Sequence, residues 1–208
     1  MKLQLALDLV DIAGAKAILD QVVDLVDIVE VGTPMILREG VTAITETKKA
    51  FPQAEVLADM KIMDAGDYEA NIAFDAGADI VTVLGVAHDA TIQGALRQAS
   101  SRDRHVMIDM IAVKDMAARA REVDAMGADF VCVHTASDLK ASGHDPLKDL
   151  KIVGPLLERA ALAVAGGITP DSLPQVTPHN PDIVAVGSYI TGHPDCRQAT
   201  LEIRKLLT

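Results

Sequence analysis

The chain alternates short apolar runs with longer stretches in which apolar residues recur at helical spacing. Four of the runs share one phrase, an Asp followed by a mostly β-branched apolar segment. A nearly continuous apolar run of this length is typical of a parallel strand that is buried on both faces. The four runs occupy residues 27–31, 79–83, 129–133 and 182–186.

A second set of apolar runs fills the gaps between these four. The shared phrases lie roughly 50 residues apart, about twice the length of one βα unit, so each gap should hold another strand. The gaps supply runs at 3–7, 55–58, 105–108 and 162–165. Helical periodicity occupies the stretches between the runs, among them 12–25, 36–51, 115–126 and 195–207.

Strands and helices that alternate eight times without a break in composition predict one α/β domain over residues 1–208. The fold class expected is a (β/α)8 TIM barrel. An open, doubly wound sheet is the alternative. It would normally begin with a glycine-rich turn after its first strand, and this chain has Asp8-Leu9-Val10-Asp11 there.

Ionisable residues fall at the carboxyl ends of the predicted strands, where TIM barrels carry their catalytic groups. Side chains alternate along a strand, and these positions share the parity expected to point inward. Five strands contribute Asp8, Glu30, Asp59 with Lys61, Asp109 and His134. Because all six would meet at one rim, their coincidence predicts an active site.

Each of these residues also has a structural interpretation. An Asp after a strand often caps a helix, as Asp8 would, and residues two apart such as Asp59 and Lys61 can form an ion pair. A histidine such as His134 can be a hydrogen-bonded core residue. Glu30 is harder to assign to structure, because a buried and unpaired carboxylate is costly, and a metal ligand or ion-pair partner is favoured there.

Glycine-containing turns predict a phosphate site beside this rim. Gly166 and Gly167 follow the seventh strand, and Gly187 and Ser188 follow the eighth. TIM barrels commonly bind phosphate at these two turns through backbone N–H groups and a helix N-terminus. Glycine lets the oxyanion approach the main chain, although ordinary turn glycines remain the structural alternative.

Composition narrows the classes of partner. The chain has 208 residues, a formal net charge of −11 and only 2% aromatic residues. It therefore lacks the basic surface and stacking rings of a nucleic-acid-binding protein. We also expect no membrane segment, no secretion signal and no disulfide framework from its two cysteines, which predicts a cytoplasmic protein. Five further histidines are expected on the surface or in loops: His88, His105, His144, His179 and His193.

The segment Asp59-Met60-Lys61-Ile62-Met63-Asp64 carries the Asp-x-Lys-x-x-Asp signature of the orotidine monophosphate decarboxylase superfamily. Within that superfamily, residues 3–8, 29–34, 57–66 and 131–135 resemble the 3-hexulose-6-phosphate synthase family. The resemblance extends over essentially the whole chain.

Two related families differ at specific positions. Orotidine monophosphate decarboxylases continue the motif with an Ile-Pro-Asn-type segment and carry a phosphate-binding Arg near the C-terminus, where this chain has Ala65-Gly66 and Ser188. The 3-keto-L-gulonate 6-phosphate decarboxylases typically have Glu and Arg where Asp109 and Ser137 stand. Decarboxylation of a keto-sugar acid phosphate stays the alternative function, and a non-catalytic phosphosugar-binding barrel is a further one.

The resemblance implies a lyase that joins formaldehyde reversibly to D-ribulose 5-phosphate, giving D-arabino-hex-3-ulose 6-phosphate, with Mg²⁺ as cofactor. Glu30 and Asp59 would be the metal ligands, since Mg²⁺ prefers carboxylate oxygens. Lys61 would offset developing negative charge, and His134 would be the base, because imidazole titrates near neutral pH.

The remaining implied roles concern orientation and assembly. Asp8 and Asp109 would orient Lys61, substrate hydroxyls or ordered water. In the superfamily the second Asp of the motif reaches across a dimer interface, so Asp64 is expected to serve the partner's site in a homodimer with shared active sites.

Overall fold

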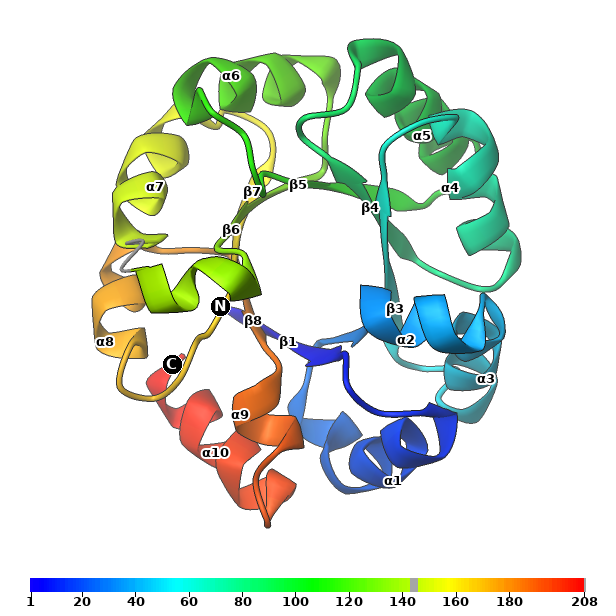
Figure 1. The fold of residues 1–208 in the computed structure, drawn as a ribbon, viewed down its shortest axis with the longest axis vertical. Coiled ribbons are helices and arrows are strands. Elements are labelled where there is room, and N and C mark those ends of the chain that lie inside the picture. Colours follow the sequence, from blue (N-terminus) through cyan, green and yellow to red (C-terminus); the bar gives the residue numbers. More distant parts are fainter. Residues whose placement is uncertain (143–145, 208) are drawn as a thin grey trace.

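The computed structural model describes residues 1–142 and 146–207, and His144 lies outside them. Its strands are all parallel and pair in chain order until β8 meets β1, which closes a barrel. The strands occupy the centre and the helices surround them (Figure 1). The strands are β1 (Lys2–Leu7), β2 (Ile28–Val31), β3 (Glu55–Ile62), β4 (Ile80–Leu84), β5 (His105–Asp109), β6 (Phe130–His134), β7 (Ala161–Ala165) and β8 (Ile183–Val186). The predicted TIM barrel is confirmed.

The helices follow the predicted stretches, with two refinements. The predicted helix over 36–51 is two helices, because Gly40 adopts a left-handed φ of 66° between them. The helix expected over 12–25 ends as a 3₁₀ turn, η1 (Val23–Leu25). The helices are α1 (Ile12–Val22), α2 (Thr33–Glu39), α3 (Thr42–Ala50), α4 (Gly66–Asp75), α5 (Asp89–Ser101), α6 (Met116–Met126), α7 (Pro146–Val153), α8 (Leu173–Val176), α9 (Ser188–Thr191) and α10 (Cys196–Leu206). Within the described residues, none of these helices is both long enough and apolar enough to cross a membrane.

Alternation along the strands divides the apolar side chains into two cores. The larger core lies between the strands and the helices, and the smaller one fills the barrel. The barrel core consists of Ile28, Leu57, Ile80, Met107, Cys132, Ala163 and Ile183. A barrel of this size is packed rather than hollow, so a ligand can enter only above this layer, at an end of the strands.

The Asp that opens each shared phrase has a structural role at the amino-terminal ends of the strands. In each case its Oδ2 atom accepts a hydrogen bond from a backbone N–H of the preceding strand, at 2.7–2.9 Å. The pairs are Asp27 with Leu3, Asp79 with Val56, Asp129 with Val106, and Asp182 with Leu162. The repeat seen in the sequence therefore fastens consecutive strands together in pairs.

Strand β3 is longer than the expected 55–58 and contains an irregularity. Its Ala58 pairs with Val81 of β4, but the next pair is Ile62 with Val83. Residues 59–61 consequently face Thr82 alone, and Lys61 has a left-handed φ of 47°. This bulge carries the motif residues into the mouth of the barrel.

Candidate active site

A cavity of about 590 Å³ lies at the carboxyl ends of the strands. Loops and strand ends from both halves of the barrel form its wall. Nine of the residues predicted from the sequence line it: Asp8, Glu30, Asp59, Lys61, His134, Gly166, Gly167, Gly187 and Ser188. The structure thus brings these side chains and turns, which were predicted from their positions at strand ends, around one cavity.

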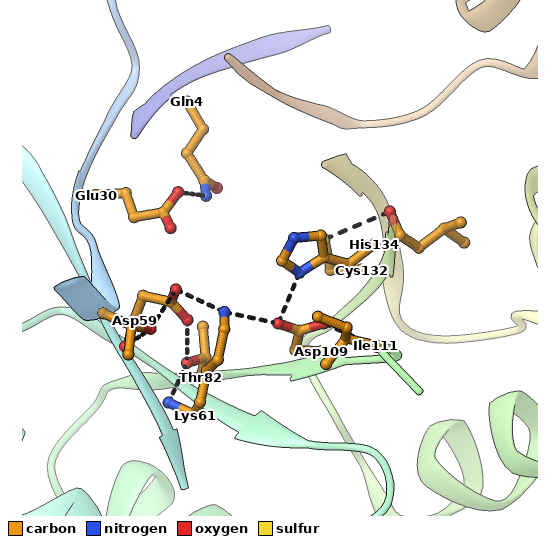
Figure 2. A network of polar contacts seen from close by, with 11 residues as sticks. Gln4, Glu30, Asp59, Lys61, Thr82, Asp109, Ile111, Cys132 and His134 are labelled. Carbon is orange, nitrogen blue, oxygen red and sulfur yellow. Dashed lines mark hydrogen bonds and ion pairs between the residues drawn. The ribbon is translucent and has the colours of Figure 1, made fainter. Parts of the chain in front are cut away.

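A chain of polar contacts joins four ionisable side chains on one side of the cavity (Figure 2). The Lys61 Nζ lies 2.7 Å from Asp59 Oδ2 and 3.0 Å from Asp109 Oδ2. The same Asp109 oxygen lies 2.9 Å from Nδ1 of His134. Asp109 is buried and is not among the cavity-lining residues, so it contacts Lys61 and His134 from behind.

The charges in this chain of contacts stabilise one another. Burial lowers the pKa of Lys61, but the charges and hydrogen bonds of Asp59 and Asp109 outweigh it and raise that pKa above its ordinary value. Burial raises the pKa of Asp109, but the contacts with His134 and Lys61 lower it by more, and the net shift is downward. At neutral pH Lys61 is therefore an ammonium and Asp109 a carboxylate.

Glu30 lies on β2, the strand next to the one that carries Asp59, and is also buried (Figure 2). The Nε2 of Gln4 donates to its Oε2 at 2.6 Å. Burial first, and then the charges of Asp59 and Asp8, raise the pKa of Glu30 well above its ordinary value. Removing a carboxylate from water beside two others is unfavourable unless a cation joins them, so this side of the cavity favours a positive ion.

The donor set fits Mg²⁺ bound with help from substrate or water. In residues 1–142 and 146–207, no group of three His, Cys, Asp or Glu side chains is arranged to bind a metal by itself. Mg²⁺ usually keeps several waters and takes only one or two protein carboxylates, which are hard oxygen donors. Glu30 and Asp59 meet that requirement, and both line the cavity.

Two glycines allow the polar wall to form. A Cβ on Gly32 would lie 2.1 Å from Oδ1 of Asp8, so only glycine there leaves Asp8 its position at the cavity. Gly166 has a φ of 105°, and a Cβ there would lie 2.4 Å from the carbonyl oxygen of Thr135. Substitution at either glycine would displace the neighbouring wall of the cavity.

The predicted phosphate turns lie together in the same cavity wall. Gly167 has a left-handed φ of 72°, and α9 starts at Ser188 directly after Gly187. The first N–H groups of a helix have no acceptor within it and suit an anion. The small side chains of Ala165 and Ala185 line the cavity beside these turns and leave room for one.

Comparison with known proteins identifies the family. Residues 1–203 match the Orotidine 5'-phosphate decarboxylase / HUMPS family. The chain belongs to this family. It is 47% identical to 3-hexulose-6-phosphate synthase of Bacillus subtilis (strain 168), covering 100% of this chain and 99% of that protein. A second such synthase, of Staphylococcus aureus (strain MSSA476), is 45% identical, covering 98% of this chain and 97% of that one.

A solved structure agrees with this membership. The crystal structure of 3-hexulose-6-phosphate synthase from Salmonella typhimurium superposes with a TM-score of 0.96 at 46% identity, covering 100% of this chain and 98% of that one. The resemblance drawn from the Asp-x-Lys-x-x-Asp motif is therefore confirmed. The prediction of an enzyme, a carbon–carbon lyase, is confirmed with it.

Polar residues that were not predicted from the sequence also contact the site. Thr82 Oγ1 donates to Asp59 Oδ1 at 2.7 Å, and Thr33 Oγ1 lies 2.8 Å from Asp59 Oδ2. Thr82 and Gln4 interrupt apolar strands at inward-pointing positions, a signal that would have found them.

The predicted site residue Asp64 does not line the cavity of its own chain. It is exposed, and its Oδ1 accepts a hydrogen bond from the Ala65 backbone N–H at 2.7 Å. Its expected role in a partner's site stays a prediction.

Proposed function

We propose that the chain catalyses the reversible aldol condensation of formaldehyde with D-ribulose 5-phosphate to D-arabino-hex-3-ulose 6-phosphate. The names of the full-length relatives support this reaction. The observation that carries it is the carboxylate of Asp109, whose Oδ2 contacts both Lys61 Nζ and His134 Nδ1. It gives the cavity a fixed cation and an oriented base.

His134 acts as the base on C1 of the sugar phosphate. Asp109 is ionised and accepts the hydrogen bond from Nδ1–H, which leaves the lone pair on Nε2 as the one that can take a proton in the cavity. Removal of the C1 proton generates a carbon nucleophile. That carbon then attacks the carbonyl carbon of formaldehyde and forms the new carbon–carbon bond, while the formaldehyde oxygen takes up a proton and becomes a hydroxyl.

Lys61 stabilises the charge that develops in this reaction. When C1 loses its proton, negative charge spreads to the neighbouring substrate oxygens, and a fixed ammonium there lowers the barrier. The raised pKa of Lys61 keeps its Nζ protonated. A protonated amine cannot attack a carbonyl, so Lys61 serves as a cation rather than as a Schiff-base nucleophile.

Glu30 and Asp59 would hold Mg²⁺. When bound, the ion supplies Lewis-acid polarisation of the substrate carbonyl and hydroxyl oxygens. Asp8 orients substrate hydroxyls or water. The turns at Gly166, Gly167, Gly187 and Ser188 bind the phosphate, which fixes the reacting carbon beside His134.

The setting of the reaction is part of the proposal. It fixes formaldehyde in the ribulose monophosphate pathway and takes place in the cytoplasm, a location consistent with the free thiols of Cys132 and Cys196. The working form is a homodimer in which Asp64 reaches the partner's cavity. The exposed side chains of Met63 and Tyr68, close to Asp64 in sequence, support an apolar contact there.

Formaldehyde consumption by the purified protein tests the proposed reaction. We expect formaldehyde to disappear only when ribulose 5-phosphate and Mg²⁺ are both present, and EDTA to stop its loss. A parallel assay measures CO₂ release from 3-keto-L-gulonate 6-phosphate. Rapid CO₂ release without formaldehyde consumption would contradict the proposal and favour decarboxylation.

A further inference from the structure

Thr82 occupies an unusual position in the barrel. It lies on β4, is 3% exposed, and is the single residue that faces the three bulged residues 59–61 of β3. Two of those three, Asp59 and Lys61, belong to the site. Its inward-facing neighbour along β4, Ile80, packs in the barrel core, so the inward face of β4 changes from apolar to polar between residues 80 and 82.

The hydroxyl of Thr82 forms two hydrogen bonds, one to each of these site residues. Its Oγ1 accepts from the Lys61 backbone N–H at 2.9 Å and donates to Asp59 Oδ1 at 2.7 Å (Figure 2). A hydroxyl has one proton and two lone pairs, so both bonds can exist together. Through one oxygen atom, Thr82 connects the backbone of one functional residue to the carboxylate of another.

The first bond replaces the ladder hydrogen bond that the Lys61 backbone N–H loses in the bulge. Residues in a bulge leave the regular ladder, and a buried N–H without an acceptor is unfavourable. The Lys61 backbone also has a φ of 47°, a left-handed conformation that residues other than glycine adopt only when their surroundings hold them there. Thr82 supplies the missing acceptor on the barrel side.

The second bond fixes the direction of a carboxylate with several contacts. Asp59 Oδ1 faces Thr82, while its Oδ2 lies 2.7 Å from Lys61 Nζ and 2.8 Å from Thr33 Oγ1. With Oδ1 fixed, Oδ2 stays directed toward the ammonium and the cavity. Loss of the Thr82 hydroxyl would free both the carboxylate and the backbone that carries the ammonium.

We propose that Thr82 is a positioning residue of this enzyme, whose hydroxyl holds Asp59 and Lys61 in their working geometry across the bulge. The role in turnover rests on the proposed function, whereas the role in holding the backbone does not. Hydrogen-bonded groups behind catalytic or metal-binding side chains typically change activity or metal affinity by about 10- to 100-fold when removed.

Three variants test the role in turnover. Thr82→Val keeps the shape and removes the hydroxyl, and we expect kcat to fall about 10- to 100-fold with KM for the sugar phosphate within about threefold. Thr82→Ser keeps the hydroxyl and should restore most of kcat. Thr200→Val is the matched control, because Thr200 is fully buried in α10, its Oγ1 donates to the Cys196 carbonyl at 2.7 Å, and it does not line the cavity. It should lower thermal stability and leave kcat unchanged.

Hydrogen exchange of the Lys61 amide tests the same bond without any assay of activity. In the unmodified protein this amide should be protected like its neighbours in the ladder, and Thr82→Val should speed its exchange by at least about tenfold while Thr82→Ser does not. A fast-exchanging Lys61 amide in the unmodified protein would overturn the proposal even if Thr82→Val failed to fold. Unchanged kcat in a folded Thr82→Val would also overturn it. If the unmodified protein consumed no formaldehyde, the proposed reaction would fail while the exchange result still decided whether Thr82 holds the backbone.

Discussion

At the scale of single residues, Asp109 orients two side chains of the site although it does not itself line the cavity. One carboxylate oxygen contacts both Lys61 Nζ and His134 Nδ1, and its Oδ1 accepts from the Ile111 backbone N–H at 2.9 Å. The backbone contact fixes the carboxylate, and the carboxylate orients the imidazole and the ammonium. Burial makes each of these contacts stronger than it would be in water.

The proposed base role of His134 gives a prediction that is independent of carbon–carbon bond formation. Without formaldehyde, the enzyme should exchange the C1 proton of ribulose 5-phosphate with solvent, and His134→Gln should slow that exchange by about 10²- to 10⁴-fold. Deuterium incorporation followed by NMR measures it. The matched control is His105→Gln. His105 also pairs with a carboxylate, Asp129 at 3.0 Å, but it lies at the amino-terminal end of β5, whereas Asp109 lies at the carboxyl end. Undiminished exchange in His134→Gln would remove His134 as the base.

A buried carboxylate outside the site gives a prediction about pH. Asp124 in α6 is 5% exposed and accepts hydrogen bonds from the backbone N–H groups of residues 158, 159 and 160. Burial raises its pKa, but these three bonds lower it more, and the net shift is downward. Its stabilising contribution is therefore complete above the pKa of an unfolded Asp, near pH 4, and is lost as the pH falls through the lower native value.

We expect Asp124→Ala to lower the free energy of unfolding by about 3 kcal/mol at pH 7. The difference from the unmodified protein should stay constant down to about pH 5 and shrink below about pH 4. Urea unfolding across this range measures it. Asp20→Ala, at an exposed position of α1, serves as the control and should change little at any pH. A difference that grew toward low pH would contradict the assignment.

At the scale of elements, the strands were predictable because a parallel barrel buries both faces of each strand. Apolar runs of the right length therefore marked them without help from tertiary structure. The end of β3 was not predictable in this way, because its bulge depends on pairing with Thr82 of the next strand. The break at Gly40 was visible only as one glycine in a helical pattern, which a helix can also tolerate.

The same contrast applies to the site. Closure of the barrel brings every carboxyl strand end to one rim, so sequence position alone gathered Asp8, Glu30, Asp59, Lys61 and His134. The hydrogen bonds of Thr82 and Gln4 depend on register between strands that are distant in the sequence, and a single sequence contains no direct record of register. For the same reason, the position of Asp109 behind two other side chains emerged only from the structure.

The hydrogen bond that each repeated Asp accepts from the preceding strand gives a prediction about stability, which can be tested at Asp79. The Asp79 side chain accepts from the Val56 N–H and also pairs with Lys48 and Arg104. We expect Asp79→Ala to cost about 2–3 kcal/mol, a decrease in Tm of roughly 5–10 °C, because it leaves a strand N–H without its acceptor. Calorimetry measures the change.

Asp24→Ala is the matched control for that substitution. Asp24 forms an ion pair of similar length with Arg197, at 2.7 Å, but its side chain is 59% exposed. Exposed ion pairs contribute little, so the control should leave Tm nearly unchanged. Equal shifts for both variants would mean that Asp79 contributes only its surface charge pairs.

At the scale of the whole molecule, the net charge of −11 opposes binding of a sugar phosphate. The distribution of charge resolves the conflict. Part of the excess acid lies at the cavity, where Asp8, Glu30 and Asp59 favour a cation and Lys61 offsets them. The predicted site residue Asp64 lies outside this balance because it is exposed and does not line its own cavity.

A mixing experiment tests whether Asp64 completes the site of a second copy. Asp64→Ala and Lys61→Ala should each be nearly inactive alone. In a mixed dimer, the subunit that retains Lys61 would receive an intact Asp64 from its partner, so one of the two sites is restored. With equal amounts and random pairing, half of the dimers are mixed, and activity should return to about a quarter of the unmodified value.

The control for that experiment combines Glu30→Gln with Lys61→Ala. Both residues line the cavity of their own chain, so every site in a mixed dimer keeps one defect and no activity should return. Sedimentation of the mixture verifies that dimers form and exchange subunits. Recovery in the control pair would mean that subunit mixing restores activity without sharing of sites. An absence of recovery in the test pair, with exchange verified, would confine Asp64 to its own chain and leave each subunit with a complete site.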